Sequence, residues 1–350
     1  MNLNSQLYPC GMTEFDLIAR YFTRTPKHAA LGVGDDCAII SPSPGMQVAI
    51  SSDMLVEGRH FFSDVSPYCL GHKALAVNLS DLAACGATPV GFTLALALPS
   101  INETWLQEFS CGLWALADAH GCELIGGDTT QGPLNICITV FGQVPHARAL
   151  LRSGAQVGDD IYVSGTLGDA RLALDALQGK IELPPEVLAQ ARLRLEQPTP
   201  RIALGTALRG VATSCIDISD GLAGDVGHIL KASGVGAQIN TDIAINLIAN
   251  SPRINWAKCQ FNSLNSLNSL NSLNPFDAEK QLQLVLAGGD DYELAFTAPQ
   301  SARQAVKAAA QCSQTPVTLI GMIQSEPGLR LVDGRGLPVD GQFASFEHFT

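Results

Sequence analysis

Six short motifs of this chain combine aspartate with glycine or serine beside an apolar run. They are GDD (34–36), SSD (51–53), NLSD (78–81), GGDTT (126–130), DISDG (217–221) and GGDDYE (288–293). One aspartate at the end of an element is ordinarily a turn or N-cap residue. Six recurrences with small neighbours instead indicate carboxylates that converge on one cleft, where their mutual repulsion requires hard divalent cations. The motifs therefore predict Mg²⁺ ligation by oxygen atoms.

Other residue types narrow the chemistry. Histidine is scarce in these motifs, which argues against a zinc site and disfavours a dinuclear phosphatase without excluding it. The chain has no G-x-x-x-x-G-K-[ST] loop, and the aspartates that follow Gly34 would repel a dinucleotide pyrophosphate. Any bound ATP is therefore expected to be held mainly through metal. Arg152 could reach a phosphate, and His60 closely follows the SSD motif, although an ordinary surface position fits either residue as well.

The motifs must be positioned by a mixture of helices and strands. The segment TEFD (13–16) resembles a capping box, with an apolar face at Phe15, Ile18, Ala19 and Phe22. Residues 68–84, residues 103–120 and the segment from Gly168 also have helical character. Short apolar runs bounded by turn residues predict strands at CAII, MQVAISS, GFTLALAL, CELIGG, NICITVFGQV, IYVSG and LQLVLA. The expected fold class is α/β, of the α+β type.

The 350 residues are enough for two domains, which we expect at 1–147 and 148–350, joined through the turn-rich segment 145–159. The second domain carries an insertion at about 250–278. Within it, residues 262–274 repeat Asn-Ser-Leu, and a period of three fits neither helix nor strand. We interpret the repeat as an expanded surface loop, which loop-closure entropy tolerates.

Composition excludes several classes of protein. With 46% hydrophobic and 15% charged residues the chain is expected to fold, and its net charge of −12 disfavours binding to nucleic acid or an anionic membrane. No targeting or membrane-spanning segment is apparent, so a cytoplasmic protein is expected. The ten cysteines include no C-x-x-C pair and are interpreted as reduced core thiols.

Taken in order, seven segments resemble the thiamine-monophosphate kinase family. They are GVGDDCAII, SSDMLVEGRHF, AVNLSDLAACGATP, LIGGDTTQGPL, RSGAQVGDDIYVSGTLGDA, CIDISDGLAGDVGHILKAS and GGDDYELAFT. The resemblance implies a two-domain fold of the aminoimidazole-ribonucleotide-synthetase type, and a homodimer in which the N-terminal sheets pair. It also implies that thiamine monophosphate and ATP give thiamine diphosphate and ADP by direct in-line transfer with several Mg²⁺ ions.

The resemblance also implies roles for individual residues. The positions that match its metal site are Asp36, Ser51, Ser52, Asp53, Asp81, Asp128, Asp217 and Asp220. The positions that match nucleotide contacts are Gly127, Asp128, Arg152 and Ser219, and those that match contacts to thiamine monophosphate are His60, Asp290 and Phe346. Two positions depart from the family: Asp290 stands where Glu is usual, and Ser52 where Thr is common. No dedicated catalytic base is expected.

Two other kinds of protein remain as alternatives. One is another ATP-using enzyme of the same superfamily, such as a selenophosphate synthetase or a hydrogenase-maturation protein. Cys10 has no neighbouring Lys, and the chain ends FASFEHFT without a terminal Cys, so both examples are weakened. The other alternative is a non-catalytic nucleotide- or metal-binding module, which should have lost ligands that this sequence retains.

Overall fold

The structure is a computed structural model that describes residues 13–27, 29–249, 254, 275–341 and 343. The chain divides into two compact units. The first comprises Met1–Ser41, Ser52–Ala74 and Val90–Thr139, and the second comprises Pro42–Ser51, Leu75–Pro89 and Val140–Thr350. Because these units interleave along the chain, they do not test the domain limits 1–147 and 148–350, which stay a prediction.

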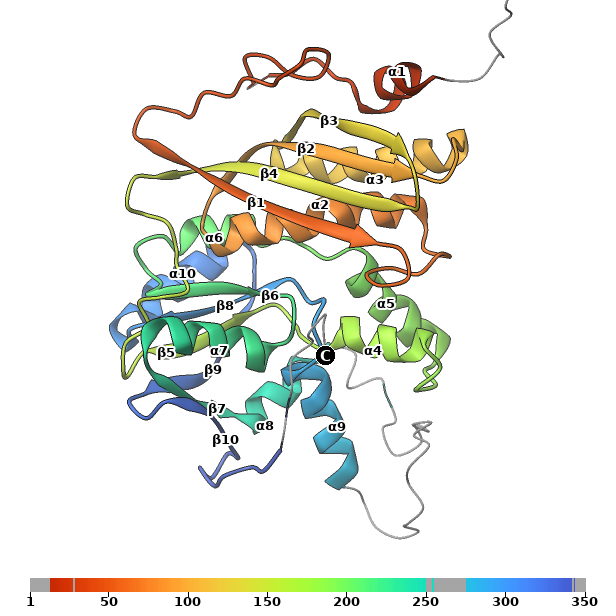
Figure 1. Ribbon diagram of the computed structural model, residues 1–350. Coiled ribbons are helices and arrows are strands. Elements are labelled where there is room, and N and C mark those ends of the chain that lie inside the picture. The colour runs from red at the N-terminus through yellow and green to blue at the C-terminus, as the bar shows by residue number, and fades with distance from the viewer. Residues whose placement is uncertain (1–12, 28, 250–253, 255–274, 342, 344–350) are drawn as a thin grey trace, which may run out of the picture. The chain divides into compact units, whose positions relative to one another are not determined.

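A four-stranded sheet has the strand order β1-β4-β2-β3. Its strands are β1 (Met46–Val56), β2 (Thr88–Leu98), β3 (Glu123–Gln131) and β4 (Asn135–Pro145). Helix α2 (Pro67–Ala84) connects β1 to β2, and helix α3 (Glu103–His120) connects β2 to β3 (Figure 1). Helix α3 begins where the Asn102 side chain accepts a hydrogen bond from the Trp105 N–H, and it ends at Gly121 with φ of 59°. The helices predicted at 68–84 and 103–120 are confirmed.

The first described helix departs from its predicted face. The capping box at Thr13 and Asp16 is present, but α1 (Glu14–Leu17) continues as a π-helix, η1 (Ile18–Phe22). Its wider turn buries Leu17, Tyr21 and Phe22, whereas Phe15 is 78% exposed. The face predicted from a period of 3.6 residues is therefore wrong in part.

A six-stranded sheet in the second unit has the order β10-β7-β9-β5-β8-β6. Its strands are β5 (Asp160–Ser164), β6 (Ser214–Ile218), β7 (Gly236–Asn240), β8 (Glu293–Ala298), β9 (Val317–Gln324) and β10 (Gly328–Val332). The pairs within it are antiparallel except that of β7 and β10.

Helices of the second unit surround this sheet, with α7 lying across it in Figure 1. They are α4 (Asp169–Leu177), α5 (Pro185–Glu196), α6 (Ile202–Ala207), α7 (Leu222–Ser233), α8 (Thr241–Ala244), η2 (Ile245–Leu247), α9 (Pro275–Leu286), η5 (Gln300–Ala302) and α10 (Arg303–Cys312). One large hydrophobic core is formed by the sheet with α4, α5, α7 and α9, and includes Val163, Leu172, Ile218, Ile229 and Val285.

Three expectations about strands are corrected. The run LQLVLA lies in helix α9 and not in a strand. Leu284, Val285 and Leu286 are all buried, so the segment is apolar on several sides and its helical period is hidden. The run CAII forms no strand, although Ile39 makes an isolated bridge to Leu31. Asp53, Asp128 and Asp217, of the SSD, GGDTT and DISDG motifs, lie within β1, β3 and β6 and not after them, because these strands extend past the three aspartates.

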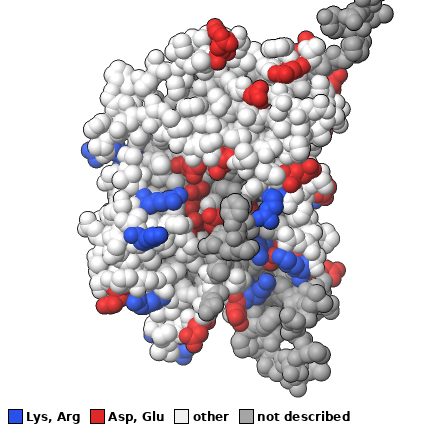
Figure 2. Space-filling model, in the orientation of Figure 1, with Lys and Arg blue, Asp and Glu red and all other residues white. Residues whose placement is uncertain are grey.

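Charged side chains are sparse on the surface, as expected from the low proportion of charged residues in the sequence. On the face shown in Figure 2, Lys and Arg side chains are few and most of the described surface is uncharged. None of the described helices is long and apolar enough to cross a bilayer. The described cysteines are free thiols, but Cys37, Cys85, Cys111 and Cys312 are exposed, so their interpretation as core residues is wrong.

Candidate functional site

A cavity of about 480 Å³ in the second unit collects four of the residues singled out from the sequence. Ser51 comes from β1, Asp81 from the last turn of α2, Arg152 from the segment before β5, and Asp217 from β6. The rest of the wall is largely apolar and includes Ile50, Leu82, Leu150, Ile216 and Ala232, together with the thiols of Cys85 and Cys215. The cavity therefore holds two carboxylates, a hydroxyl and a guanidinium in an apolar frame.

Hydrogen bonds fix both carboxylates of this cavity. The Ser51 hydroxyl donates to Asp81 Oδ2, and the Ser80 hydroxyl donates to Asp217 Oδ2 at 2.9 Å. Ser80 is fully buried and Asp217 is 5% exposed. Successive residues of a helix point about 100° apart, so α2 directs Asp81 and Ser80 to different partners from adjacent positions. Each carboxylate keeps oxygen lone pairs beyond those that these serines use.

Two carboxylates, Asp81 and Asp217, and one guanidinium, Arg152, act on the Cys85 thiol in this cavity. Although Cys85 as a residue is exposed, it lines the cavity, and partial burial there raises the pKa of its thiol; the charges of Asp81 and Asp217 raise it further. Arg152 acts in the opposite direction but is the smallest of these influences. Burial also raises the pKa of the neighbouring Cys215 thiol. Both thiols are therefore held in the neutral form, and the cavity favours a cation over an anion.

The donors of this cavity fit Mg²⁺. Within the described part of the chain, no three His, Cys, Asp or Glu side chains are placed to hold one ion between them. Mg²⁺ commonly binds one or two carboxylates and completes its octahedron with water and substrate phosphates, so a preformed cage is not required. Asp81, Asp217 and Ser51 offer such an incomplete set of hard oxygen donors.

A second group of predicted residues meets on two loops of the same unit. The loop between β6 and α7 carries Ser219 and Asp220, and the loop before β8 carries Asp290. The Asp290 N–H donates to the Ser219 carbonyl at 2.8 Å, and the Tyr292 N–H donates to the Ile218 carbonyl at 2.8 Å. Asp290 and Tyr292 have φ of 60° and 50°, a conformation that few residues other than glycine adopt.

One carboxylate below these loops was missed from the sequence. Asp225 Oδ2 accepts the backbone N–H groups of Ser219, Asp220 and Gly221, each at 3.1 Å. Burial raises the pKa of Asp225 to about 7, the three hydrogen bonds oppose that rise, and the charge of Asp220 adds to it. A signal was available, because an Asp in the first turn of a helix often organises the chain that enters it.

The remaining predicted residues that the structure describes lie in the first unit. Gly127 and Asp128 line a cavity of about 40 Å³ with Phe22 and Leu94. Gly127 has φ of 148°, and a Cβ there would lie 1.9 Å from the Leu94 carbonyl oxygen, so only glycine fits. Asp128 is exposed.

Four further predicted residues of the first unit are Asp36, Ser52, Asp53 and His60. The Ser52 hydroxyl lies 2.9 Å from the Thr139 hydroxyl. His60 Nδ1 accepts the Val56 N–H at 3.0 Å, and the exposed Asp36 donates its N–H to the Asp35 side chain. Asp53 is half-buried in β1.

Nine of the predicted residues fall into three groups whose members share a cavity or joined loops. Ser51, Asp81, Arg152 and Asp217 share a cavity, Ser219, Asp220 and Asp290 share two joined loops, and Gly127 and Asp128 share a small cavity. Phe346 and the repeat at 262–274 lie outside the described residues. Ser80 and Asp225 are additional polar residues that act on predicted ones.

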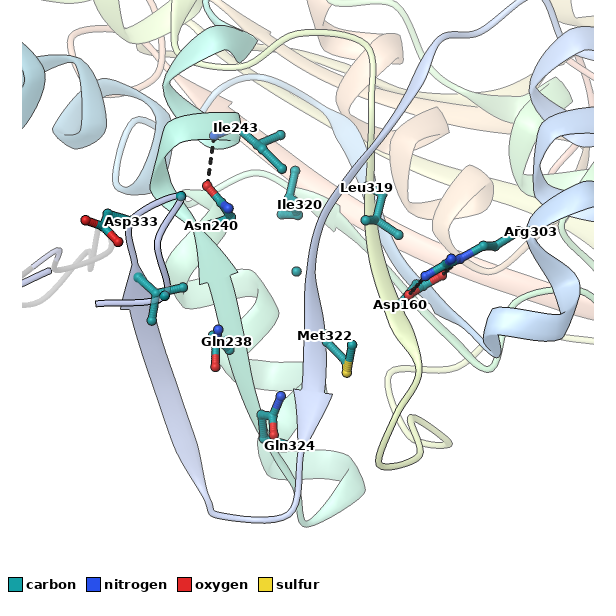
Figure 3. Close-up of a pocket in the computed structure, with 14 residues that line it drawn as sticks. Asp160, Gln238, Asn240, Ile243, Arg303, Leu319, Ile320, Met322, Gln324 and Asp333 are labelled. Carbon is teal, nitrogen blue, oxygen red and sulfur yellow. Dashed lines mark hydrogen bonds and ion pairs between the residues drawn. The ribbon is translucent and has the colours of Figure 1, made fainter. Parts of the chain in front are cut away.

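Another cavity lies on the six-stranded sheet and contains none of the predicted residues. It measures about 360 Å³ and is lined by Gln238 and Asn240 of β7 and by Met322 and Gln324 of β9 (Figure 3). Its charged groups are neutralised locally, since Arg303 holds Asp160 through two hydrogen bonds of 2.6 and 2.9 Å. This cavity therefore has fewer charged groups available to bind a metal or a phosphate than the cavity of Asp81 and Asp217 has.

Comparisons with known proteins agree with this architecture. The chain matches the family models described as AIR synthase related protein, N-terminal domain, over residues 34–144, and C-terminal domain, over residues 156–334. It is 43% identical over 349 residues to the thiamine-monophosphate kinase of Salmonella typhimurium, a match that covers 97% of this chain and 99% of that protein.

This chain is also similar to solved structures of thiamine-monophosphate kinases, in both fold and sequence. The thiamine-monophosphate kinase of Stenotrophomonas maltophilia K279a has a TM-score of 0.76 and 41% identity, covering 92% of this chain and 95% of that one. AaThiL, complexed with AMPPCP and TMP, has a TM-score of 0.69 and 28% identity, covering 88% of this chain and 89% of that one. The fold class expected from the sequence is confirmed.

Proposed function

Because the chain belongs to the thiamine-monophosphate kinase family, we propose that it transfers the γ-phosphoryl group of ATP to thiamine monophosphate and so produces thiamine diphosphate and ADP. The near-full-length match to kinases of this name carries the assignment. An oxygen of the acceptor phosphate forms a bond to the γ-phosphorus, and the bond from that phosphorus to the β,γ-bridging oxygen breaks. The protein is an ATP-dependent phosphotransferase.

The chemistry requires little of the protein in the way of proton transfer. The acceptor is a phosphate monoester, which is largely a dianion at neutral pH because its second pKa is about 6. The main barriers are the repulsion between two polyanions and their in-line alignment. A set of carboxylates, hydroxyls and one guanidinium, without a dedicated base, suits that task.

The cavity of Ser51, Asp81, Arg152 and Asp217 is our proposed centre for the nucleotide phosphates and their metal. Bound Mg²⁺ would lower the repulsion between the phosphates, and Asp81, Asp217 and Ser51 would hold it. Arg152, which lines the cavity, would bind an ATP phosphate, and the hydrogen bond from Ser80 would hold the Asp217 carboxylate in place.

For the remaining residues, we propose the roles predicted from the sequence. We expect Asp36, Ser52, Asp53, Asp128 and Asp220 to complete the metal sites. A separate set contacts the substrates: Gly127, Asp128 and Ser219 bind the nucleotide, and His60, Asp290 and Phe346 bind thiamine monophosphate. A homodimer with paired N-terminal sheets and a cytoplasmic location stay predictions.

The experiment is a product assay. Purified protein with ATP, Mg²⁺ and thiamine monophosphate should form thiamine diphosphate and ADP in equal amounts, as measured by chromatography. Release of inorganic phosphate without thiamine diphosphate would indicate a phosphatase. Turnover of another acceptor in its place would refute the substrate. The Asp53→Ala variant tests the wider metal set, because near-normal activity would remove Asp53 from it.

A further inference from the structure

We propose that Asp225 is a positioning residue that holds Ser219 and Asp220, and through them Asp290, in the arrangement needed for substrate binding. The inference rests on the proposed function. Asp225 is 3% exposed and lies in the first turn of α7, below the loop that it organises. It is not expected to touch either substrate.

The first step is the contact between Asp225 and the loop. Its Oδ2 atom accepts three consecutive backbone N–H groups at 3.1 Å, those of Ser219, Asp220 and Gly221. Three donors that converge on one oxygen fix the direction of three successive peptide planes, and therefore the direction in which the Ser219 and Asp220 side chains leave the backbone.

The loop also lies close to the chain that follows α9. Gly221 has φ of 118°, and a Cβ at this position would lie 2.9 Å from Ala287 Cα. The loop thus contacts both the Asp225 carboxylate and the backbone that follows α9. Without the carboxylate, the three N–H groups would lose their shared acceptor, while the close approach of Gly221 to Ala287 would remain.

The second step joins the loop to Asp290. The carbonyl groups of Ile218 and Ser219 accept the N–H groups of Tyr292 and Asp290, both at 2.8 Å. A Cβ at Gly289 would lie 2.8 Å from the Ser219 carbonyl oxygen, so the two loops are as close as their backbones permit. A shift of the β6–α7 loop is therefore transmitted directly to Asp290.

The same contact has a consequence for phosphate binding. N–H groups at the beginning of a helix often bind a phosphate of a nucleotide. Here the N–H groups that lead into α7 already share the Asp225 oxygen. A phosphate would have to displace a buried carboxylate to use them. The loop is thus expected to contribute side chains, not a backbone anion site.

The test compares Asp225→Asn and Asp225→Ala with Asp159→Asn. Asp159 is the matched control, since it is also 3% exposed and accepts the Gln156 N–H at 2.9 Å, yet it has no place in the proposed site. The measurements are the KM values for ATP and thiamine monophosphate, kcat, and the melting temperature.

A neutral amide oxygen forms roughly half as strong a hydrogen bond as a carboxylate, so Asp225→Asn should raise both KM values at least about threefold. Asp225→Ala removes the acceptor and should lower kcat/KM at least about tenfold beyond the Asn variant. Asp159→Asn should keep wild-type KM values.

If Asp225→Asn folds and keeps wild-type KM values, the inference is overturned. It is also overturned if the activity lost in the variants is fully accounted for by the smaller fraction of folded protein. Should Asp225→Ala not fold, the KM values of the Asn variant decide alone. A wild-type enzyme that makes no thiamine diphosphate would instead refute the proposed function, so the two failures are distinct.

Discussion

Replacing Ser80 by alanine is a sharp test of the cavity, because it changes a residue that should touch neither substrate. The Ser80 hydroxyl donates to Asp217 Oδ2 at 2.9 Å, and Ser80 is fully buried. A hydrogen bond to a charged group contributes about 1.5–3 kcal/mol. If the bond is needed in the transition state, its loss lowers kcat/KM by about tenfold to a hundredfold, since about 1.4 kcal/mol corresponds to a factor of ten.

The assay for Ser80→Ala is steady-state formation of thiamine diphosphate at several Mg²⁺ concentrations. The control is Ser110→Ala, because Ser110 is 3% exposed but donates to the Gln107 carbonyl within α3. Ser80→Ala should need more Mg²⁺ for half-maximal activity, and the control should not. Wild-type kcat/KM and an unchanged Mg²⁺ requirement in Ser80→Ala would refute the role of Asp217 as a positioned ligand.

Four other perturbations have defined outcomes. Asp217→Ala should abolish turnover while leaving the circular dichroism spectrum intact; residual activity near wild type would mean that the metal is elsewhere. Glu293→Gln leaves two arginines facing a buried neutral group and should cost about 3–5 kcal/mol, seen as a lower melting temperature. Burial lowers the pKa of His120 below 6.5, so the folded state binds its proton less readily than the unfolded chain and stability falls as the pH drops below 6.5. Melting curves should show a weaker acid dependence for His120→Gln, but not for the exposed control His146→Gln. Deleting residues 262–274 should leave kcat and both KM values largely unchanged; a large loss would make the repeat part of the site.

The sequence predicted elements well where local signals are complete. Helix α3 has an Asn cap, a regular apolar stripe and a terminal Gly121, so its bounds follow from short-range chemistry. Helix α9 lacks such signals in the run LQLVLA, where burial on several sides hides the period. The buried face of the π-helix at Ile18–Phe22 was also not predictable, because it depends on tertiary packing that a helical-wheel projection does not represent.

The sequence selected the residues of the proposed site, but not the contacts between them. Order and motif identity were enough to select Asp81, Arg152 and Asp217, which share a cavity. Ser80 escaped notice because its partner Asp217 is 137 positions away in the chain, and nothing local marks the pair. Asp225 differs, since its partners lie only four to six positions away and a reading of helix entry could have found it.

The proposed arrangement would explain how an acidic chain without a P-loop can hold a triphosphate. The N–H groups that lead into α7 are taken by Asp225, and the carboxylates of Asp81 and Asp217 outweigh Arg152 at the Cys85 thiol. A free polyanion would therefore meet a repulsive field in this cavity. In the proposed site, the nucleotide would therefore enter together with Mg²⁺, which Asp81 and Asp217 would bind. It follows that ATP affinity should depend steeply on Mg²⁺, and that this dependence should weaken when Asp81 or Asp217 is neutralised.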